Sequence, residues 1–409
     1  MKKTIYTFLI GALFLSTITK TNSALAQTAY IANSDDDNVS VIDVATNTVT
    51  ATIAVGIFPY GVSISPDGSK VYFTNRLNDN VSVINTTTNT VIATIVVGNG
   101  TTGISVSPDG SKVYVANYYG GSVNVINTTT NLVTATIPVG SNPVGISVTP
   151  DGSKVYVANW TSNSVSVINT ATNLVTTTIA AVGIGPEGVS ITPDGSKVYV
   201  ANVNGNTVSV INTATNTVTT NVAVGANPTG IAVSPDGTKV YVANWGSSTV
   251  SVINTTTNTV TATITVGSFP TGISVSPDGS KVYVVNQNDN NVSVINTATN
   301  LFTATIVVGN GPTSFGNFIS SYTNTGINEM TQSNLFSVYP NPANSQINVK
   351  ADAKLFGSVY TIYDNTGKLV LSGKINSANT IIELGNLSGG IYMFSVGENL
   401  KQTFKVIKE

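Results

Sequence analysis

The aromatic and charged side chains that could bind a ligand gather at one position of an internal repeat. The motif Y-x-x-N occurs seven times, and the residue after its asparagine changes from one occurrence to the next. In chain order these residues are Ser34, Arg76, Tyr118, Trp160, Val203, Trp245 and Gln287. Aromatic rings on a surface with few charges can stack on sugars or anchor a protein partner. Arg76, Tyr118, Trp160 and Trp245 are therefore the first binding candidates.

A second group of candidates lies just before or at the start of the first strand of a repeat. This group contains Phe58, Tyr60, Glu187 and Phe269, and Tyr119 is added because it directly follows Tyr118. The alternative is that all these rings only cover the loops and plug the mouth of a central channel.

Four acidic residues offer a different chemistry. Asp35, Asp37, Asp79 and Asp289 fall in repeats that become neighbours if the two ends of the array meet. Clusters of oxygen ligands favour Ca²⁺, but the spacing matches no calcium loop, so a solvated acidic patch explains them as well. Paired carboxylates can also hydrolyse glycosides, yet nothing in the sequence marks one of them as a buried acid. We therefore expect no metal, no cofactor and no catalysis.

The composition excludes several classes of function. The chain has neither cysteine nor histidine, which removes disulfides and every catalytic triad that uses histidine as its base. Its net charge is −2, and no run of basic residues follows the N-terminus. A nucleic-acid partner would need such a basic surface, so none is expected.

The repeat predicts the elements that position the candidates. The tyrosine of the motif recurs every 42 residues, with one step of 43. Residues 144–182 show the pattern: VGISV, a TPDG turn, KVYVAN, SVSVIN, a TATN turn and LVTTTIAAV. Alternating apolar and polar residues predict four antiparallel strands per repeat, which is the content of one propeller blade. The variable residues then lie in loops on one face, and the PDG and TATN turns lie on the other.

The two ends of the array are complementary. It begins in mid-repeat at TAYIAN and stops after GNGPTSFGNFIS, residues 309–320, which matches only a first strand. The fold class predicted is all-β: a seven-bladed β-propeller with four-stranded blades. Its C-terminal strand is expected to complete the N-terminal blade and close the ring, because closure leaves no bare sheet edge.

The motifs SPDGSKVYVAN, SVSVINTATN and TVTATITVG resemble the YVTN family of seven-bladed propeller repeats. The resemblance covers residues 29 to about 320. It implies this fold and an extracytoplasmic setting, without implying one ligand. Enzymes on related propellers, such as lactonases, rely largely on histidine or clustered acids, so the resemblance carries no activity over to this histidine-free chain.

The N-terminus predicts a signal peptide over residues 1–26. Lys2 and Lys3 precede an apolar segment, and Ala24-Leu25-Ala26 forms a cleavage site between Ala26 and Gln27. The propeller is assigned to residues 27–320, and a polar linker to residues 321–334. No later segment is apolar enough to span a membrane.

Residues 335–409 predict a small β-sandwich of short alternating strands. They resemble the type A C-terminal sorting domain of the type IX secretion system. The motifs are Tyr339-Pro340-Asn341-Pro342, Gly367-Lys368, Gly389-Gly390-Ile391-Tyr392 and a basic terminus. The resemblance implies the type IX secretion machinery as a partner and the medium or the outer-membrane surface of a Gram-negative bacterium as the destination.

We expect a secreted or cell-surface, noncatalytic recognition module that binds a glycan or a protein through its variable loop face. A structural surface-coat protein is the first alternative. A hydrolase or lyase that uses Asp79, Glu187 or Asp289 is the second.

Overall fold

The computed structural model describes residues 27–180, 182–320, 336–351, 353–364, 368–396 and 402–408. The chain divides into two compact units, Met1–Thr325 and Gly326–Glu409. The predicted signal peptide, residues 1–26, and the predicted linker, residues 321–334, lie outside the described residues. No helix in the described ranges is long and apolar enough to cross a membrane.

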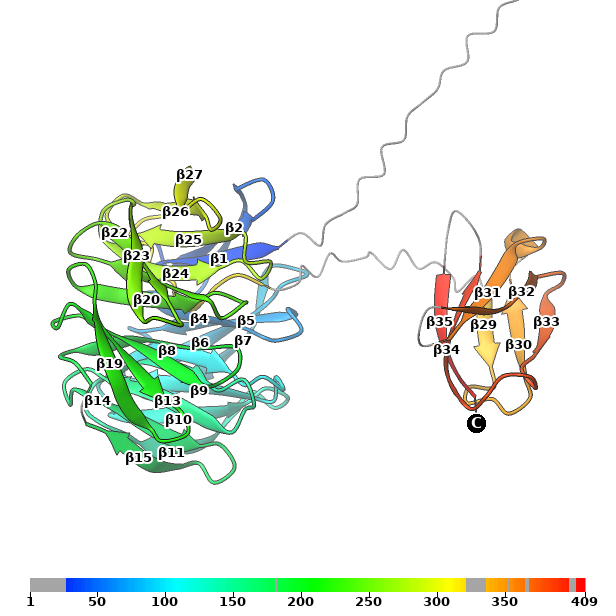
Figure 1. Cartoon of the computed structure of the whole chain (residues 1–409), viewed down its shortest axis with the longest axis horizontal. Helices are drawn as coiled ribbons and strands as arrows, with labels where there is room; N and C mark the ends of the chain where they lie inside the picture. The colour runs from blue at the N-terminus through cyan, green and yellow to red at the C-terminus, as the bar shows by residue number, and fades with distance from the viewer. Residues whose placement is uncertain are drawn as a thin grey trace, which may run out of the picture. The chain divides into compact units, whose positions relative to one another are not determined.

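The first unit is a ring of seven small antiparallel sheets, the blades (Figure 1). Blade 1 contains β1 (Thr28–Asn33), β2 (Asn38–Asp43) and β3 (Thr48–Ala54). Blade 2 contains β4 (Pro59–Ile64), β5 (Lys70–Asn75), β6 (Asn80–Asn85) and β7 (Thr90–Val96). Blade 3 contains β8 (Thr101–Val106), β9 (Lys112–Asn117), β10 (Ser122–Asn127) and β11 (Leu132–Pro138). Blade 4 contains β12 (Pro143–Val148), β13 (Lys154–Asn159), β14 (Ser164–Asn169) and β15 (Leu174–Ile179).

The remaining blades repeat this order. Blade 5 contains β16 (Pro186–Ile191), β17 (Lys197–Asn202), β18 (Thr207–Asn212) and β19 (Thr217–Ala223). Blade 6 contains β20 (Pro228–Val233), β21 (Lys239–Asn244), β22 (Thr249–Asn254) and β23 (Thr259–Thr265). Blade 7 contains β24 (Pro270–Val275), β25 (Lys281–Asn286), β26 (Asn291–Asn296) and β27 (Leu301–Val307). The predicted seven-bladed all-β fold is confirmed.

The PDG turns join the first two strands of blades 2 to 7. In blade 3, Asp109 Oδ1 accepts hydrogen bonds from Ser107 Oγ at 2.5 Å and from the Ser111 N–H at 3.0 Å. These donors lower the pKa of Asp109 to about 2. Gly110 takes a φ of 71°, a conformation that glycine adopts without steric cost.

Adjacent blades pack through apolar residues of their inner strands. Tyr114 of blade 3, for example, shares a buried cluster with Ile146 and Val155 of blade 4. The lysine of each PDG turn adds a polar link: Lys112 Nζ donates to the carbonyl of Thr170, in the next blade, at 2.9 Å. The outermost strand of each blade is mostly exposed and buries one apolar residue, such as Ile137 of β11.

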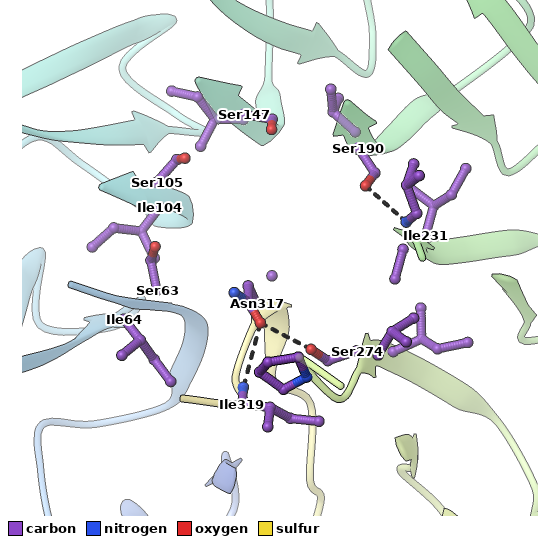
Figure 2. A pocket seen from close by; sticks show the side chains of 18 of the residues that line it. Ser63, Ile64, Ile104, Ser105, Ser147, Ser190, Ile231, Ser274, Asn317 and Ile319 are labelled. Atoms are coloured by element: carbon purple, nitrogen blue, oxygen red, sulfur yellow. Dashed lines mark hydrogen bonds between the residues drawn. The ribbon is translucent and has the colours of Figure 1, made fainter. Parts of the chain in front are cut away.

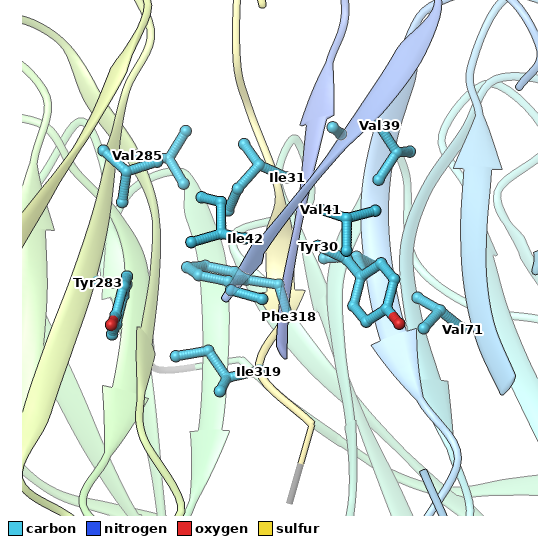
Figure 3. Close-up of a cluster of buried hydrophobic side chains, with 14 of the residues drawn as sticks. Tyr30, Ile31, Val39, Val41, Ile42, Val71, Tyr283, Val285, Phe318 and Ile319 are labelled. Atoms are coloured by element: carbon cyan, nitrogen blue, oxygen red, sulfur yellow. The ribbon is translucent and has the colours of Figure 1, made fainter. Parts of the chain in front are cut away.

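The same links join blade 7 to blade 1. Lys281 Nζ donates to the Val44 carbonyl and Tyr283 Oη donates to Asn47 Oδ1, both at 2.8 Å. Phe318 and Ile319 are buried in one cluster with Tyr283 and with residues of β1 and β2 (Figure 3). These are the contacts that the predicted closure requires.

The closing segment, residues 312–320, differs from the regular first strand that the sequence predicts. Pro312 bridges Asn33 and Ile319 bridges Ala29. The closing segment therefore has two more residues between its paired positions than a regular first strand, such as β12, in which Pro143 pairs with Asn159 and Val148 with Val155. The excess forms a bulge in which β28 (Phe315–Asn317) pairs parallel with β4 of blade 2. Gly316 has a φ of 126°, and a Cβ there would lie 2.4 Å from the Val62 carbonyl oxygen. The bulge thus depends on glycine.

The second unit is the predicted β-sandwich. One sheet contains β29 (Phe336–Tyr339), β30 (Gln346–Ala351) and β33 (Asn379–Glu383). The other contains β32 (Leu369–Lys374), β31 (Val359–Tyr363), β34 (Gly390–Val396) and β35 (Gln402–Lys408), and a short 3₁₀ helix, η1, spans Ala353–Leu355. Phe336, Ile347, Ile362 and Phe394 are buried in its core. The Tyr339–Pro340 and Asn341–Pro342 peptide bonds are cis.

Candidate functional site

Two repeated positions surround the mouth of the central channel on the loop face. The outer position is the residue after the motif asparagine, described above. The inner position is the second residue of each first strand. Its occupants are Tyr60, Thr102, Val144, Glu187, Thr229, Thr271 and, in the closing segment, Thr313.

Threonine at the inner position connects neighbouring blades. Thr102 Oγ1 donates to the Pro143 carbonyl at 3.0 Å, and Thr229 Oγ1 donates to the Pro270 carbonyl at 3.1 Å. Tyr60, Val144 and Glu187 replace this threonine in blades 2, 4 and 5. At these three positions, therefore, the chain lacks the threonine that connects neighbouring blades elsewhere in the ring.

These departures face one cavity. It has a volume of about 210 Å³, and its lining residues come from blades 2 to 5: Tyr60, Arg76, Thr102, Tyr118, Val144, Trp160 and Glu187. Five of the nine candidates from the sequence therefore come together here. Thr102 and Val144 were missed, although they occupy the same repeat position as Tyr60 and Glu187.

Arg76 lies between two tyrosines of this cavity, which we call the mouth pocket. Its guanidinium carbon is 5.5 Å from the ring centroid of Tyr60 and 5.1 Å from that of Tyr118. Both distances are within the range of cation–π attraction. Among the described residues, no carboxylate lies within salt-bridge distance of Arg76 and no hydrogen-bond acceptor engages its guanidinium.

Glu187 is the acidic residue of the mouth pocket, and its side chain is only 8% exposed. Tyr60 Oη donates to Glu187 Oε1 at 3.3 Å. Burial raises the pKa of Glu187 to about 7, although the Tyr60 hydrogen bond and the charge of Arg76 act in the opposite direction. Burial and the nearby Glu187 also raise the pKa of Tyr60 well above its usual value. Near neutral pH, therefore, Glu187 exists in both protonation states.

The other four candidates lie outside the mouth pocket. Trp245 stacks on Phe269, with ring centroids 4.3 Å apart and planes 18° from parallel. Tyr119 is 65% exposed and meets Tyr118 edge to face, with centroids 5.1 Å apart. Phe58 takes a φ of 57°, and its carbonyl accepts the Arg76 N–H at 3.0 Å. Its backbone thereby helps to position Arg76.

Three of the acidic candidates accept hydrogen bonds from loop backbones. Asp37 Oδ1 accepts the Phe58 N–H at 2.9 Å, and Asp79 Oδ1 accepts the Gly100 N–H at 2.6 Å. Asp289 Oδ2 accepts the Ser268 N–H at 2.7 Å. Asn163 occupies the same place as Asp79 two blades later and accepts the Gly185 N–H at 2.8 Å, so this role does not require a charge. The oxygens of Asp35 lie beside Gly311, where a Cβ would meet them.

The described residues contain no group of three or more acidic, histidine or cysteine side chains that could hold a metal ion. Asp37, Asp79 and Asp289 have a structural explanation in the loops, which the sequence interpretation as a solvated patch did not provide.

A second cavity, of about 430 Å³, lies in the channel toward the PDG turns. Ser63, Ser105, Ser147, Ser190 and Ser274 surround it, and Asn317 of the bulge projects among them (Figure 2). Ser63 Oγ accepts the Val106 N–H at 3.1 Å, and Ser274 Oγ donates to Asn317 Oδ1 at 3.0 Å. This ring of serines was not predicted from the sequence, because alternating serines are also typical of any half-exposed strand.

Comparison with known proteins adds three family matches. Residues 337–409 match the secretion system C-terminal sorting domain. Residues 128–223 and 212–305 match the family described as lactonase, 7-bladed beta-propeller, and residues 8–110 match the YNCE-like beta-propeller. The comparison with curated proteins finds no match.

Two solved structures are similar in fold. One is hydrazine synthase from Kuenenia stuttgartiensis, with 24% identity and a TM-score of 0.58, covering 63% of this chain and 88% of that one. The other is a functionally unknown protein from Desulfotomaculum acetoxidans, with 19% identity and a TM-score of 0.62, covering 71% and 99% of the two chains. At these identities, the likeness extends to the fold alone.

Proposed function

Because this chain is a seven-bladed β-propeller protein with a type IX secretion C-terminal sorting domain, we propose that it is a secreted, noncatalytic recognition module that binds carbohydrate in the mouth pocket. The observation that carries the proposal is the convergence of three aromatic rings, one arginine and one buried carboxyl group in a single concavity.

The size and chemistry of the mouth pocket favour a sugar over a protein partner. Its volume of about 210 Å³ is below the roughly 300–1,000 Å³ of pockets for drug-sized ligands, so it suits one ring-sized group. Aromatic faces offer stacking, while Glu187 and Arg76 offer hydrogen bonds at the edge of a ring. A protein interface would instead need about 800 Å² on this side.

Delivery to the outside follows from the sorting domain. Its family match supports a secreted or cell-surface protein and implies contact with the type IX secretion machinery. We further propose that the N-terminal 26 residues act as a signal peptide and that the mature protein reaches the outer-membrane surface or the medium.

One observation favours a second candidate function, the hydrolysis of a lactone or ester. Part of the propeller matches the lactonase family, and a carboxyl group with a pKa of about 7, such as Glu187, can act as a general acid or base near neutral pH. Against catalysis, the mouth pocket contains no second described carboxylate and the chain has no histidine. Turnover of a lactone or ester panel that disappears in Glu187→Gln would support this candidate.

A glycan array probed with the full chain tests the proposal. We expect binding that Trp160→Ala abolishes and that the matched control Trp245→Ala leaves intact, since Trp245 lies outside the mouth pocket. Binding that survives in Trp160→Ala would contradict the proposed site. Failure to bind any glycan, together with capture of a defined protein through the same residues, would replace the carbohydrate by a protein partner. Ordered self-assembly without ligand binding would favour the surface-coat alternative.

A further inference from the structure

We infer that the ligand of the mouth pocket is an acidic sugar, a pyranose bearing a carboxylate, with its carboxylate on Arg76 and its ring against Trp160. This inference rests on the proposed function and names the chemical class of the ligand.

Among the described residues of the propeller, Arg76 is the single cation on the loop face. It is the only arginine of the chain, and the six propeller lysines all follow PDG turns on the opposite face. Five of these lysines, such as Lys154, donate to a carbonyl of the next blade, and Lys281 donates to blade 1. Of the described propeller residues, a ligand anion that approaches the channel mouth therefore meets one positive charge, that of Arg76.

The tyrosines around Arg76 position its guanidinium so that it can bind an anion. The rings of Tyr60 and Tyr118 restrict its side chain while leaving its N–H groups without an acceptor among the described residues. A planar guanidinium donates two parallel hydrogen bonds to a carboxylate, which gives both strength and orientation. Because the side chain is already positioned, binding loses less conformational entropy.

Glu187 lies in the same pocket without forming an ion pair with Arg76. It is held by Tyr60 Oη and is buried from water. Burial favours its neutral form, which can donate a hydrogen bond to a sugar hydroxyl and leaves the charge of Arg76 for the ligand.

The remaining walls suit the body of a pyranose. The indole of Trp160 provides an apolar face, and Val144, which also lines the cavity, is 4% exposed. The indole N–H has no acceptor among the described residues. A neutral sugar could stack here, but it would leave Arg76 without a partner in a partly desolvated site, which costs free energy.

The test is isothermal titration calorimetry of the full chain with short galacturonic acid oligomers, their methyl esters and neutral galactose oligomers of equal length. We expect the acid to bind about 10- to 100-fold more tightly than either neutral probe, the range of a hydrogen bond to a charged group. Arg76→Gln should remove this preference, Arg76→Lys should restore part of it, and Trp160→Ala should weaken binding of all three probes. Thermal unfolding of each variant checks that the fold is intact.

Equal binding of acidic and neutral oligomers, unchanged in Arg76→Gln, would overturn the acidic-sugar inference and leave the proposed function standing. Acid binding that Arg76→Gln and Trp160→Ala both retain and that 0.5 M salt abolishes would also overturn it, because the contact would then be nonspecific. Binding of no carbohydrate by an intact protein would contradict the inference and the proposed function together.

Discussion

Tyr60 of blade 2 and Glu187 of blade 5 meet across the mouth of the propeller channel, with Tyr60 Oη donating to Glu187 Oε1 at 3.3 Å. The two residues are 127 positions apart in the chain. Both occupy a repeat position that holds threonine in four other places. This contact connects blades that are not neighbours, which the threonine bonds never do.

Glu187 should make the stability of the protein fall as the pH rises. Its pKa is about 7 in the folded protein and 4.5 as a free group, so the folded state binds a proton more tightly. The associated stability is fully present below pH 4.5 and is lost between about pH 4.5 and 7. The shift corresponds to about 3 kcal/mol. Glu187→Gln should remove this dependence and be more stable than wild type at pH 8. Denaturant unfolding of wild type and Glu187→Gln at pH 5 and pH 8 measures the pH dependence and the stability difference. The same change in free energy of unfolding between the two pH values in both proteins would contradict the assignment of this dependence to Glu187.

The aspartates of the PDG turns should make the stability of the protein fall at acidic pH. All six have lowered pKa values, and their turn hydrogen bonds lower them, most clearly in Asp109 and Asp151 at about 2. Their contribution is present above about pH 3.8 and is lost as the pH falls through their folded pKa values. Acid titration followed by circular dichroism should show unfolding centred below pH 3.8. Replacing Asp109 with asparagine should make this loss less steep, and an unchanged slope would count against the turn bonds as its cause.

Phe318 tests whether the closing segment stabilises the ring. Its side chain is completely buried between the two ends of the array, so Phe318→Ala should lower the free energy of unfolding by about 3–5 kcal/mol. Phe302 of β27 is 48% exposed, and Phe302→Ala is the matched control with a small effect. Equal losses in the two variants would show that closure contributes little.

The inner-position threonines should contribute through their bonds to the next blade. Thr229→Val removes the donor to the Pro270 carbonyl and should cost about 1 kcal/mol. Thr52→Val, on the exposed strand β3, serves as the control. Chemical denaturation compares the free energies of unfolding of the two variants. An unchanged value in Thr229→Val would mean that the threonine bond does not stabilise the ring, and that Tyr60 and Glu187 replace a threonine without structural cost.

Much of the fold was predictable because the same pattern of strands and turns occurs in seven successive repeats. The recurrence of the Y-x-x-N motif about every 42 residues defines the blades, and the Pro-Asp-Gly turns define the hairpins. The bulge at Gly316 and Asn317 was not predictable, since the closing segment occurs once and offers no second copy for comparison. Its two extra residues change the register without changing the alternation of apolar side chains.

The candidate site was predictable by residue but not by arrangement. Arg76, Tyr118 and Trp160 stood out because they occupy a position that varies among repeats whose neighbouring positions are nearly constant. Their convergence with Glu187 depends on side-chain directions around the ring, which spacing does not specify. For the same reason Trp245 appeared equivalent to Trp160, whereas it stacks on Phe269 instead.

The two tryptophans allow the most direct test of the mouth pocket as the binding site. Trp245→Phe leaves Trp160 as the only indole of the chain, and Trp160→Phe leaves Trp245. In a fluorescence titration of the full chain with galacturonic acid oligomers, we predict a saturable change in Trp245→Phe and none in Trp160→Phe. A saturable change confined to Trp160→Phe, or the same change in both variants, would place the ligand elsewhere and contradict the account.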